Sequence, residues 1–178
     1  MKRLSFFSSF AILCSAFLVS GCIHYSLSGA STNAKSIQVD QFYNNTELSP
    51  ANLGQTLTNR VKDYYQQNSS LRVVPAGGEL QIEGVIMTYA TAPIAPQASS
   101  GSGANTTPNY GAQTRLTIGV KVNYVDTLEP KNSFKDRSFS FYADFDNSQD
   151  FFSVQEQLEK KIFDQIMIDI FNATIANW

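Results

Sequence analysis

The sequence predicts an α+β fold in which two helices pack on one face of a mostly antiparallel four- to five-stranded sheet. Two segments carry apolar residues at helical spacing, and several shorter segments alternate apolar and polar residues as half-buried strands do. These segments occur in the order β-α-β-β-β-β-α, without an internal repeat. Placing both helices on one face of the sheet buries every apolar face in two layers.

The composition supports one globular domain, because 43% of the 178 residues are hydrophobic and 16% are charged. A net charge of −2 gives no electrostatic reason to expect a nucleic-acid partner. No apolar run reaches the roughly 18–20 residues of a membrane-spanning helix, which excludes a polytopic membrane protein.

The domain begins with a strand at 36–42, in which apolar and polar residues alternate. Ser49 and Pro50 then supply an N-cap and a proline suited to the first helical turn, which predicts a helix over about residues 50–67. The apolar stripe of this helix consists of Leu53, Leu57, Val61 and Tyr64.

Two strands follow, a short one at 71–74 and a longer one at 80–91. The residues expected to share one face of the longer strand are Leu80, Ile82, Ile86 and Thr88. The next segment, 92–112, is rich in Pro, Gly and Ser and exceeds the usual length of a connection. Such a length is typical of a loop that is either functional or mobile.

The clearest strand of the sequence is 113–126, which returns through a turn at 128–133 into a strand over 134–143. The residues of this hairpin expected to face the core are Leu116, Ile118, Val120, Val122, Tyr124, Phe139 and Phe141. The basic residues that the hairpin offers are Arg115 and Lys121 on the polar face of its first strand, and Lys135 and Arg137 on its second.

The last segment opens with Ser153 and Glu156 in a capping-box pattern, which predicts a helix from there to about Asn177. Its broad apolar stripe consists of Leu158, Ile162, Phe163, Ile166, Met167, Ile170 and Phe171.

The N-terminus has the layout of a lipoprotein signal. Lys2 and Arg3 precede an apolar stretch, and Val19-Ser20-Gly21-Cys22 places small residues before a cysteine. We therefore expect a cleaved signal at 1–21, a lipidated tether at 22–34 and one α+β domain at 35–178. Cys22 would carry diacylglycerol and an acyl group such as palmitate on its amine. Position 23 is Ile rather than Asp, which favours the periplasmic face of the outer membrane.

The residue inventory argues against an enzyme. Cys14 lies in the signal and Cys22 is the expected acylation site, so no thiol remains for a nucleophile or a zinc site. His24, the single histidine, lies beside the anchor, where a catalytic triad is not expected. No cofactor motif is present, and we predict neither a cofactor nor catalytic residues.

One acidic segment resembles the first half of a calcium loop, with Asp144, Asp146, Ser148 and Asp150 at alternate positions. Gln149 stands where the loop needs glycine, and Gln155 replaces the bidentate Glu. Acidic residues before a helix are favoured by the helix dipole in any case, so we predict no metal site.

The basic residues of the hairpin leave two interpretations open. They could bind phosphates or carboxylates of an anionic ligand, or they could be the ordinary charges of a solvated sheet face.

Several segments, in this order, resemble LptE-type lipopolysaccharide-assembly lipoproteins of Bacteroides-like bacteria. They are the Cys22 lipobox followed by Tyr25-Ser26-Leu27-Ser28-Gly29-Ala30, then Leu53-Gly54-Gln55-Thr56-Leu57-Thr58, Arg115-Leu116-Thr117-Ile118, Tyr142-Ala143-Asp144-Phe145-Asp146, and the ending Ile170-Phe171-Asn172 to Asn177-Trp178.

The resemblance implies a non-enzymatic subunit with two helices against a four-stranded sheet, seated as a plug in the outer-membrane β-barrel LptD. It implies help in assembling that barrel and in delivering lipopolysaccharide to the outer leaflet. Some family members bind lipopolysaccharide through basic side chains on the sheet side, which makes Arg115, Lys121 and Arg137 the candidates here. The expected partners are thus the barrel, lipopolysaccharide and, through Cys22, the outer membrane.

An alternative is a lipoprotein that reaches across the periplasm to activate an enzyme of cell-wall synthesis. That role needs a long tether. About a dozen residues separate Cys22 from the first strand and span at most roughly 45 Å, which favours the plug.

Overall fold

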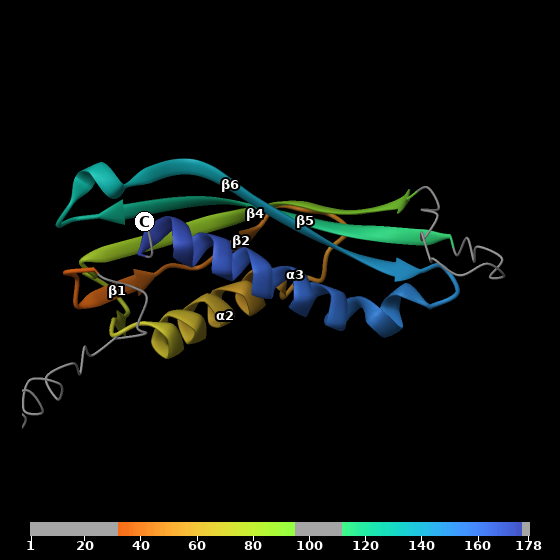
Figure 1. The fold of residues 1–178 in the computed structure, drawn as a ribbon, viewed down its shortest axis with the longest axis horizontal. Helices are drawn as coiled ribbons and strands as arrows, with labels where there is room; N and C mark the ends of the chain where they lie inside the picture. The colour runs from red at the N-terminus through yellow and green to blue at the C-terminus, as the bar shows by residue number, and fades with distance from the viewer. Residues whose placement is uncertain (1–31, 95–111, 176–178) are drawn as a thin grey trace, which may run out of the picture.

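The computed structural model describes residues 32–94 and 112–175, which form a mixed six-stranded sheet with two helices on one face (Figure 1). The strands are β1 (Ser36–Val39), β2 (Tyr43–Asn44), β3 (Arg72–Val74), β4 (Leu80–Ile94), β5 (Gln113–Asp126) and β6 (Phe134–Asp146). The helices are α2 (Leu53–Asn68), α3 (Phe151–Thr174) and the short 3₁₀ helix η1 (Pro130–Asn132). The predicted α+β class and the placement of both helices are confirmed.

The sheet is larger and more mixed than predicted. Its order is β3-β1-β4-β5-β6, with β2 pairing β4 beyond the end of β1. The long strands β4, β5 and β6 are antiparallel, whereas β1, β2 and β3 pair in parallel. The parallel part arises because α2 forms a crossover that returns the chain to the same end of the sheet, as parallel pairing requires.

The predicted strand at 36–42 is interrupted, which adds a strand to the expected number. The backbone N–H of Phe42 donates to Oγ1 of Thr58 on α2 at 2.9 Å, instead of pairing with β4. The chain rejoins β4 at Tyr43, which lies opposite Val85. The bond from Phe42 links the sheet to α2 at a position where both residues are buried.

Both helix starts differ from the capping predictions. The N-cap of α2 is Asn52, without a side-chain hydrogen bond, because the Ser49 hydroxyl accepts from Nδ2 of Asn44 and Oγ1 of Thr46, each at 2.7 Å. Helix α3 begins at Phe151, where the Asp150 carboxylate accepts from the Ser153 backbone N–H at 3.2 Å. Ser153 is thus inside the helix, and the capping box predicted for it is wrong.

The core lies between the sheet and the two helices and matches the inward faces predicted for β5 and α3. On α2 the buried tyrosine is Tyr65, whereas Tyr64, predicted for the apolar stripe, is only partly buried. Leu116, Ile118, Val120, Val122 and Tyr124 on β5 are all buried, as is the stripe of α3 from Leu158 to Phe171. The helices meet where the hydroxyls of Tyr65 and Thr174 lie 2.6 Å apart in the core.

Strand β4 departs from simple alternation at a bulge between Ile86 and Thr88. The bulge places Thr88 opposite Gly119 on the outer face and turns Tyr89 inward, so the prediction that Thr88 faces the core is wrong. The strand also runs to Ile94, three residues beyond its predicted end at 91.

Several predicted features lie outside the described residues. These are the signal, Cys22, most of the tether and the central part of the loop 92–112. The last helix ends at Thr174, three residues before its predicted end near Asn177. Within the described part of the chain, neither long helix has the length and hydropathy needed to cross a bilayer.

Candidate functional site: the outer face of the sheet

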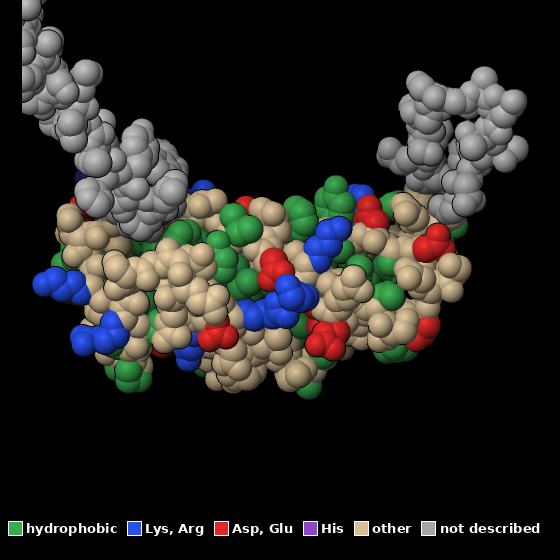
Figure 2. Space-filling view, turned by 60° about the horizontal axis from the view of Figure 1, so that its bottom comes forward, with side chains coloured by type: hydrophobic (Ala, Val, Ile, Leu, Met, Phe, Trp, Pro, Cys, Tyr) green, Lys and Arg blue, Asp and Glu red, His purple; other side chains and the backbone are tan. Residues whose placement is uncertain are grey.

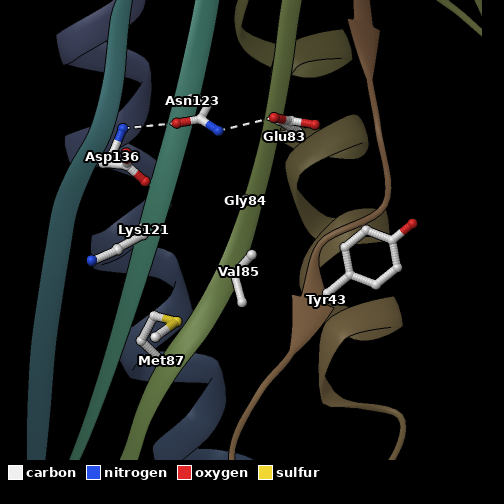
Figure 3. A pocket seen from close by; sticks show the side chains of 8 residues that line it. All are labelled: Tyr43, Glu83, Gly84, Val85, Met87, Lys121, Asn123 and Asp136. Carbon is white, nitrogen blue, oxygen red and sulfur yellow. Dashed lines mark hydrogen bonds between the residues drawn. The ribbon is translucent and has the colours of Figure 1, made fainter.

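The face of the sheet that the helices leave uncovered carries a shallow hollow, here called the outer hollow. Its volume is about 290 Å³, and it lies over β4, β5 and the start of β6 (Figure 3). The residues that line it are Tyr43, Glu83, Gly84, Val85, Met87, Lys121, Asn123 and Asp136.

Alternation along each strand places these side chains on one face. Val85 and Met87 belong to the polar-facing set of β4, and Lys121 lies directly opposite Val85 on β5. Tyr43 joins them from β2 because it also pairs with Val85. Tyr43 is 63% exposed and Met87 43% exposed, which gives the hollow an apolar rim on a mostly polar face.

A hydrogen-bonded bridge fixes the other side of the outer hollow. Asn123 donates from Nδ2 to Oε1 of Glu83 at 2.9 Å and accepts at Oδ1 from the Asp136 backbone N–H at 2.7 Å (Figure 3). Asp136 has a positive φ of 54° and lies at a β-bulge of β6 opposite Asn123. The bridge therefore ties three strands together beside the Lys121 ammonium.

Lys121 is the candidate cation that is available to a ligand. Its side chain is exposed, and it makes no ion pair with any carboxylate in the described parts of the chain. An ammonium beside apolar side chains can bind an anionic group whose neighbouring atoms are apolar.

Arg115 lies on the same face, but its guanidinium is already engaged. Nε donates to Oδ1 of Asp144 at 2.7 Å and Nη2 donates to Oδ2 at 2.9 Å. The guanidinium carbon also lies 3.6 Å from the centroid of the Tyr142 ring. The hydrogen bonds from Arg115 lower the pKa of Asp144, so this carboxylate stays charged and holds the arginine.

Arg137 does not share this face, contrary to the expectation that one polar surface carries all three candidates. It lies opposite the buried Val122 and two residues from Phe139, so alternation turns it to the helix side of the edge strand. Its guanidinium carbon is 5.2 Å from the Phe134 ring centroid and 5.5 Å from that of Phe139.

The acidic segment before α3 has structural roles for each of its carboxylates. Asp144 pairs with Arg115, Asp146 accepts from the Ser148 backbone N–H at 2.8 Å, and Asp150 caps α3. Among the residues that the structure describes, no group of three or more His, Cys, Asp or Glu side chains is arranged to hold a metal ion.

Sequence reasoning did not find the apolar rim of the outer hollow. The alternation of 80–91 does contain a signal for Val85 and Met87, because both alternate with core residues along the strand and so point to the outer face. Tyr43 had no such signal, because its position depends on the break in the strand at Phe42.

Similar solved structures show the same fold at low sequence identity. Hypothetical protein CT253 of Chlamydia trachomatis is 13% identical with a TM-score of 0.50, and the match covers 81% of this chain and all of that one. Protein XCC0632 of Xanthomonas campestris, of family DUF330, is 8% identical with a TM-score of 0.50, covering 82% of this chain and 86% of that one.

No curated protein matches the sequence at a significant level. The family model described as lipopolysaccharide-assembly, LptE, matches residues 34–174, which is most of the chain and nearly all of the described domain. The chain therefore belongs to the LptE family of lipopolysaccharide-assembly proteins.

Proposed function

We propose that this protein is a non-enzymatic, lipid-anchored subunit of the outer-membrane lipopolysaccharide translocon. In this role it occupies the lumen of a partner β-barrel of the LptD type, aids assembly of that barrel and helps deliver lipopolysaccharide to the outer leaflet. The observation that carries the proposal is the LptE family match over residues 34–174. Cys22 would hold the chain at the periplasmic side of the outer membrane.

The surface of the domain suits a water-lined lumen. Barrel lumens are polar, so a plug must offer polar side chains. Polar and small side chains from three strands dominate the outer face beyond the outer hollow, with Tyr142 the exposed aromatic among them. They include Thr88 and Ala90 on β4, Thr117 and Gly119 on β5, and Ser138 and Ser140 on β6.

The outer hollow is the proposed contact for lipopolysaccharide. A phosphate of the lipid would meet the Lys121 ammonium, and the adjoining apolar part of the lipid would lie against Val85 and Met87. Arg115 would act indirectly, because its guanidinium is bound to Asp144.

The experiment that tests the main proposal is an affinity pull-down of tagged protein with Cys22 intact from detergent-solubilised outer membranes. Mass spectrometry of the eluate should identify one large β-barrel in stoichiometric amount. A cell-wall synthesis enzyme in place of the barrel, or elution only as a free monomer, would contradict it.

The role of Lys121 is tested separately, with purified lipopolysaccharide and the variant Lys121→Met. Losing a charge-assisted hydrogen bond should weaken binding by about tenfold. Arg137→Met, which removes a cation from the other side of the sheet, is the matched control and should bind like the parent. Equal affinity of all three proteins would remove Lys121 from the site.

A further inference from the structure

The side chains of the outer hollow form two rows across the sheet, one apolar and basic, the other acidic. The first row consists of Tyr43, Val85 and Lys121, which pair across β2, β4 and β5. The second row consists of Glu83, Asn123 and Asp136, which the two hydrogen bonds of Asn123 join. The rows lie two residues apart along β4 and β5, which separates them by about 7 Å.

The charges of the two rows are unequal. Lys121 supplies one positive charge, whereas Glu83 and Asp136 supply two negative charges, and the other lining residues are uncharged. The hollow therefore attracts an anionic group only beside Lys121. A second anionic group at the other row would meet two carboxylates of its own sign.

The two carboxylates retain free acceptor atoms. Glu83 uses Oε1 to accept from Asn123, and no donor within the described residues reaches its Oε2 or the Asp136 carboxylate. Figure 3 shows these two carboxylates on either side of Asn123, at one end of the hollow. Ionised carboxylates only accept hydrogen bonds, so the groups that suit them in a ligand are hydroxyl or amide N–H groups.

The side of the molecule that carries the helices is arranged differently. Acidic and basic side chains are interspersed there (Figure 2), and Arg60 and Lys160 both pair with Asp164, at 3.3 and 2.8 Å. In the outer hollow, neither Lys121 nor the two carboxylates make an ion pair with any described residue. Their charges are therefore left for a ligand.

The apolar part of the outer hollow fits the face of a sugar ring. Tyr43 pairs with Val85, and Met87 follows on the same face of β4, so the exposed tyrosine ring and the thioether lie beside one another. An aromatic ring packs against the flat C–H face of a sugar as it does against other apolar groups. Sites for drug-sized ligands occupy about 300–1,000 Å³. At about 290 Å³, the hollow is the size of one sugar unit rather than of a whole lipid.

We propose that the outer hollow recognises one sugar unit of lipopolysaccharide that carries a single phosphate. This rests on the proposed function, which supplies lipopolysaccharide as the ligand. The phosphate binds the Lys121 ammonium, and Tyr43 covers one face of the ring. Hydroxyl groups at the far end of the ring donate to Glu83 and Asp136. A second phosphate at that end would meet the carboxylates and weaken binding.

The test uses soluble headgroup probes and the chain carrying Cys22→Ala, so that binding does not depend on a lipid or a barrel. The probes are glucose 1-phosphate, glucose 1,6-bisphosphate, glucose and inorganic phosphate. The readout is the NMR resonance of isotope-labelled methionine methyl groups. Met87 lines the hollow, whereas Met167 on α3 is buried in the core and serves as the internal control for folding.

Glucose 1-phosphate should shift the Met87 resonance and leave that of Met167 in place. It should bind more tightly than glucose or inorganic phosphate, and about fivefold more tightly than glucose 1,6-bisphosphate. Fivefold is the effect of one like-charge contact at about 4 Å in water. Lys121→Gln should reduce the affinity for both sugar phosphates to that for glucose. An unmoved Met87 resonance, or inorganic phosphate binding as tightly as glucose 1-phosphate, would overturn the proposal.

A pair of substitutions tests the carboxylates directly. Glu83→Gln with Asp136→Asn should abolish the preference for one phosphate over two, and asparagine tolerates the positive φ of Asp136. The matched control, Asp63→Asn with Glu156→Gln, makes the same change of charge on the two helices and should keep the preference. Equal affinities of the parent for the two sugar phosphates, or a preference that survives Glu83→Gln with Asp136→Asn, would also overturn the proposal.

These measurements separate failure of this inference from failure of the proposed function. A β-barrel recovered in the pull-down, together with no selective binding of glucose 1-phosphate, would overturn the sugar-phosphate site alone. Selective binding by the chain without any barrel partner would support the site and contradict the translocon role.

Discussion

Gly84 on β4 lies against the ring of Phe42, which belongs to the linker between β1 and β2. A Cβ added at this position would lie 2.5 and 2.7 Å from two ring atoms of Phe42 and 2.8 Å from the carbonyl oxygen of Lys121. Phe42 is fully buried, so its ring has no empty space to move into, and the bond from its backbone N–H to Thr58 holds its main chain in place. Overpacking of this kind costs about 2–3 kcal/mol, which is the destabilisation expected for Gly84→Ala.

The assay is urea unfolding followed by far-UV circular dichroism, on the chain with Cys22→Ala. Gly119→Ala is the matched control, because its added Cβ meets the Thr88 side chain at 3.2 Å on the open outer face. That control should change stability by less than about 1 kcal/mol, since alanine suits a strand better than glycine.

A double-mutant cycle identifies Phe42 as the cause. Phe42→Ala alone should cost about 3–5 kcal/mol, and in its background Gly84→Ala should cost about 1–2 kcal/mol less than in the parent. If the two substitutions are additive within about 0.5 kcal/mol, the ring is not what limits the space and the packing argument is refuted. An equally small loss of stability for Gly84→Ala and Gly119→Ala would also refute the packing argument.

Three further predictions concern caps and polar contacts, each checked by the same unfolding assay. Asp150→Ala should cost about 1 kcal/mol because it removes the N-cap of α3, whereas Glu156→Ala should be near neutral because the capping box is absent. Arg115→Gln should lower the free energy of unfolding at pH 7, and this loss should become smaller toward pH 2. Because the pKa of Asp144 is lowered in the folded state, the contribution of the pair is present above the unfolded pKa and is lost as the pH falls through the folded pKa. Tyr89→Phe should cost about 1 kcal/mol, since the hydroxyl donates to Glu159 at 2.8 Å from a buried position.

The parts of the fold that depend on local pattern could be predicted from the sequence. The inward residues of β5 and the stripe of α3 follow periods of 2 and 3.6, and packing did not override them. The breaks could not be predicted. The strand is interrupted at Phe42 by a bond to Thr58, which is distant in sequence, and the bulge near Met87 depends on the pairing register with β5. Both are tertiary effects, and they decide how many strands form and which way Thr88 points.

The candidate site shows the same limit in electrostatic terms. The sequence gives the position of a basic residue but not the carboxylate that pairs with it. That pairing decides whether the cation is available to bind a ligand. Arg115 and Lys121 lie on one face of one strand, yet Asp144 lies directly opposite Arg115, whereas Ser138 lies opposite Lys121. The register between β5 and β6 therefore gives Arg115 a structural ion pair and gives Lys121 no carboxylate as its direct cross-strand neighbour on β6. Because Asp144 would have to be abandoned for Arg115 to bind a phosphate, Lys121→Met should weaken lipopolysaccharide binding more than Arg115→Gln.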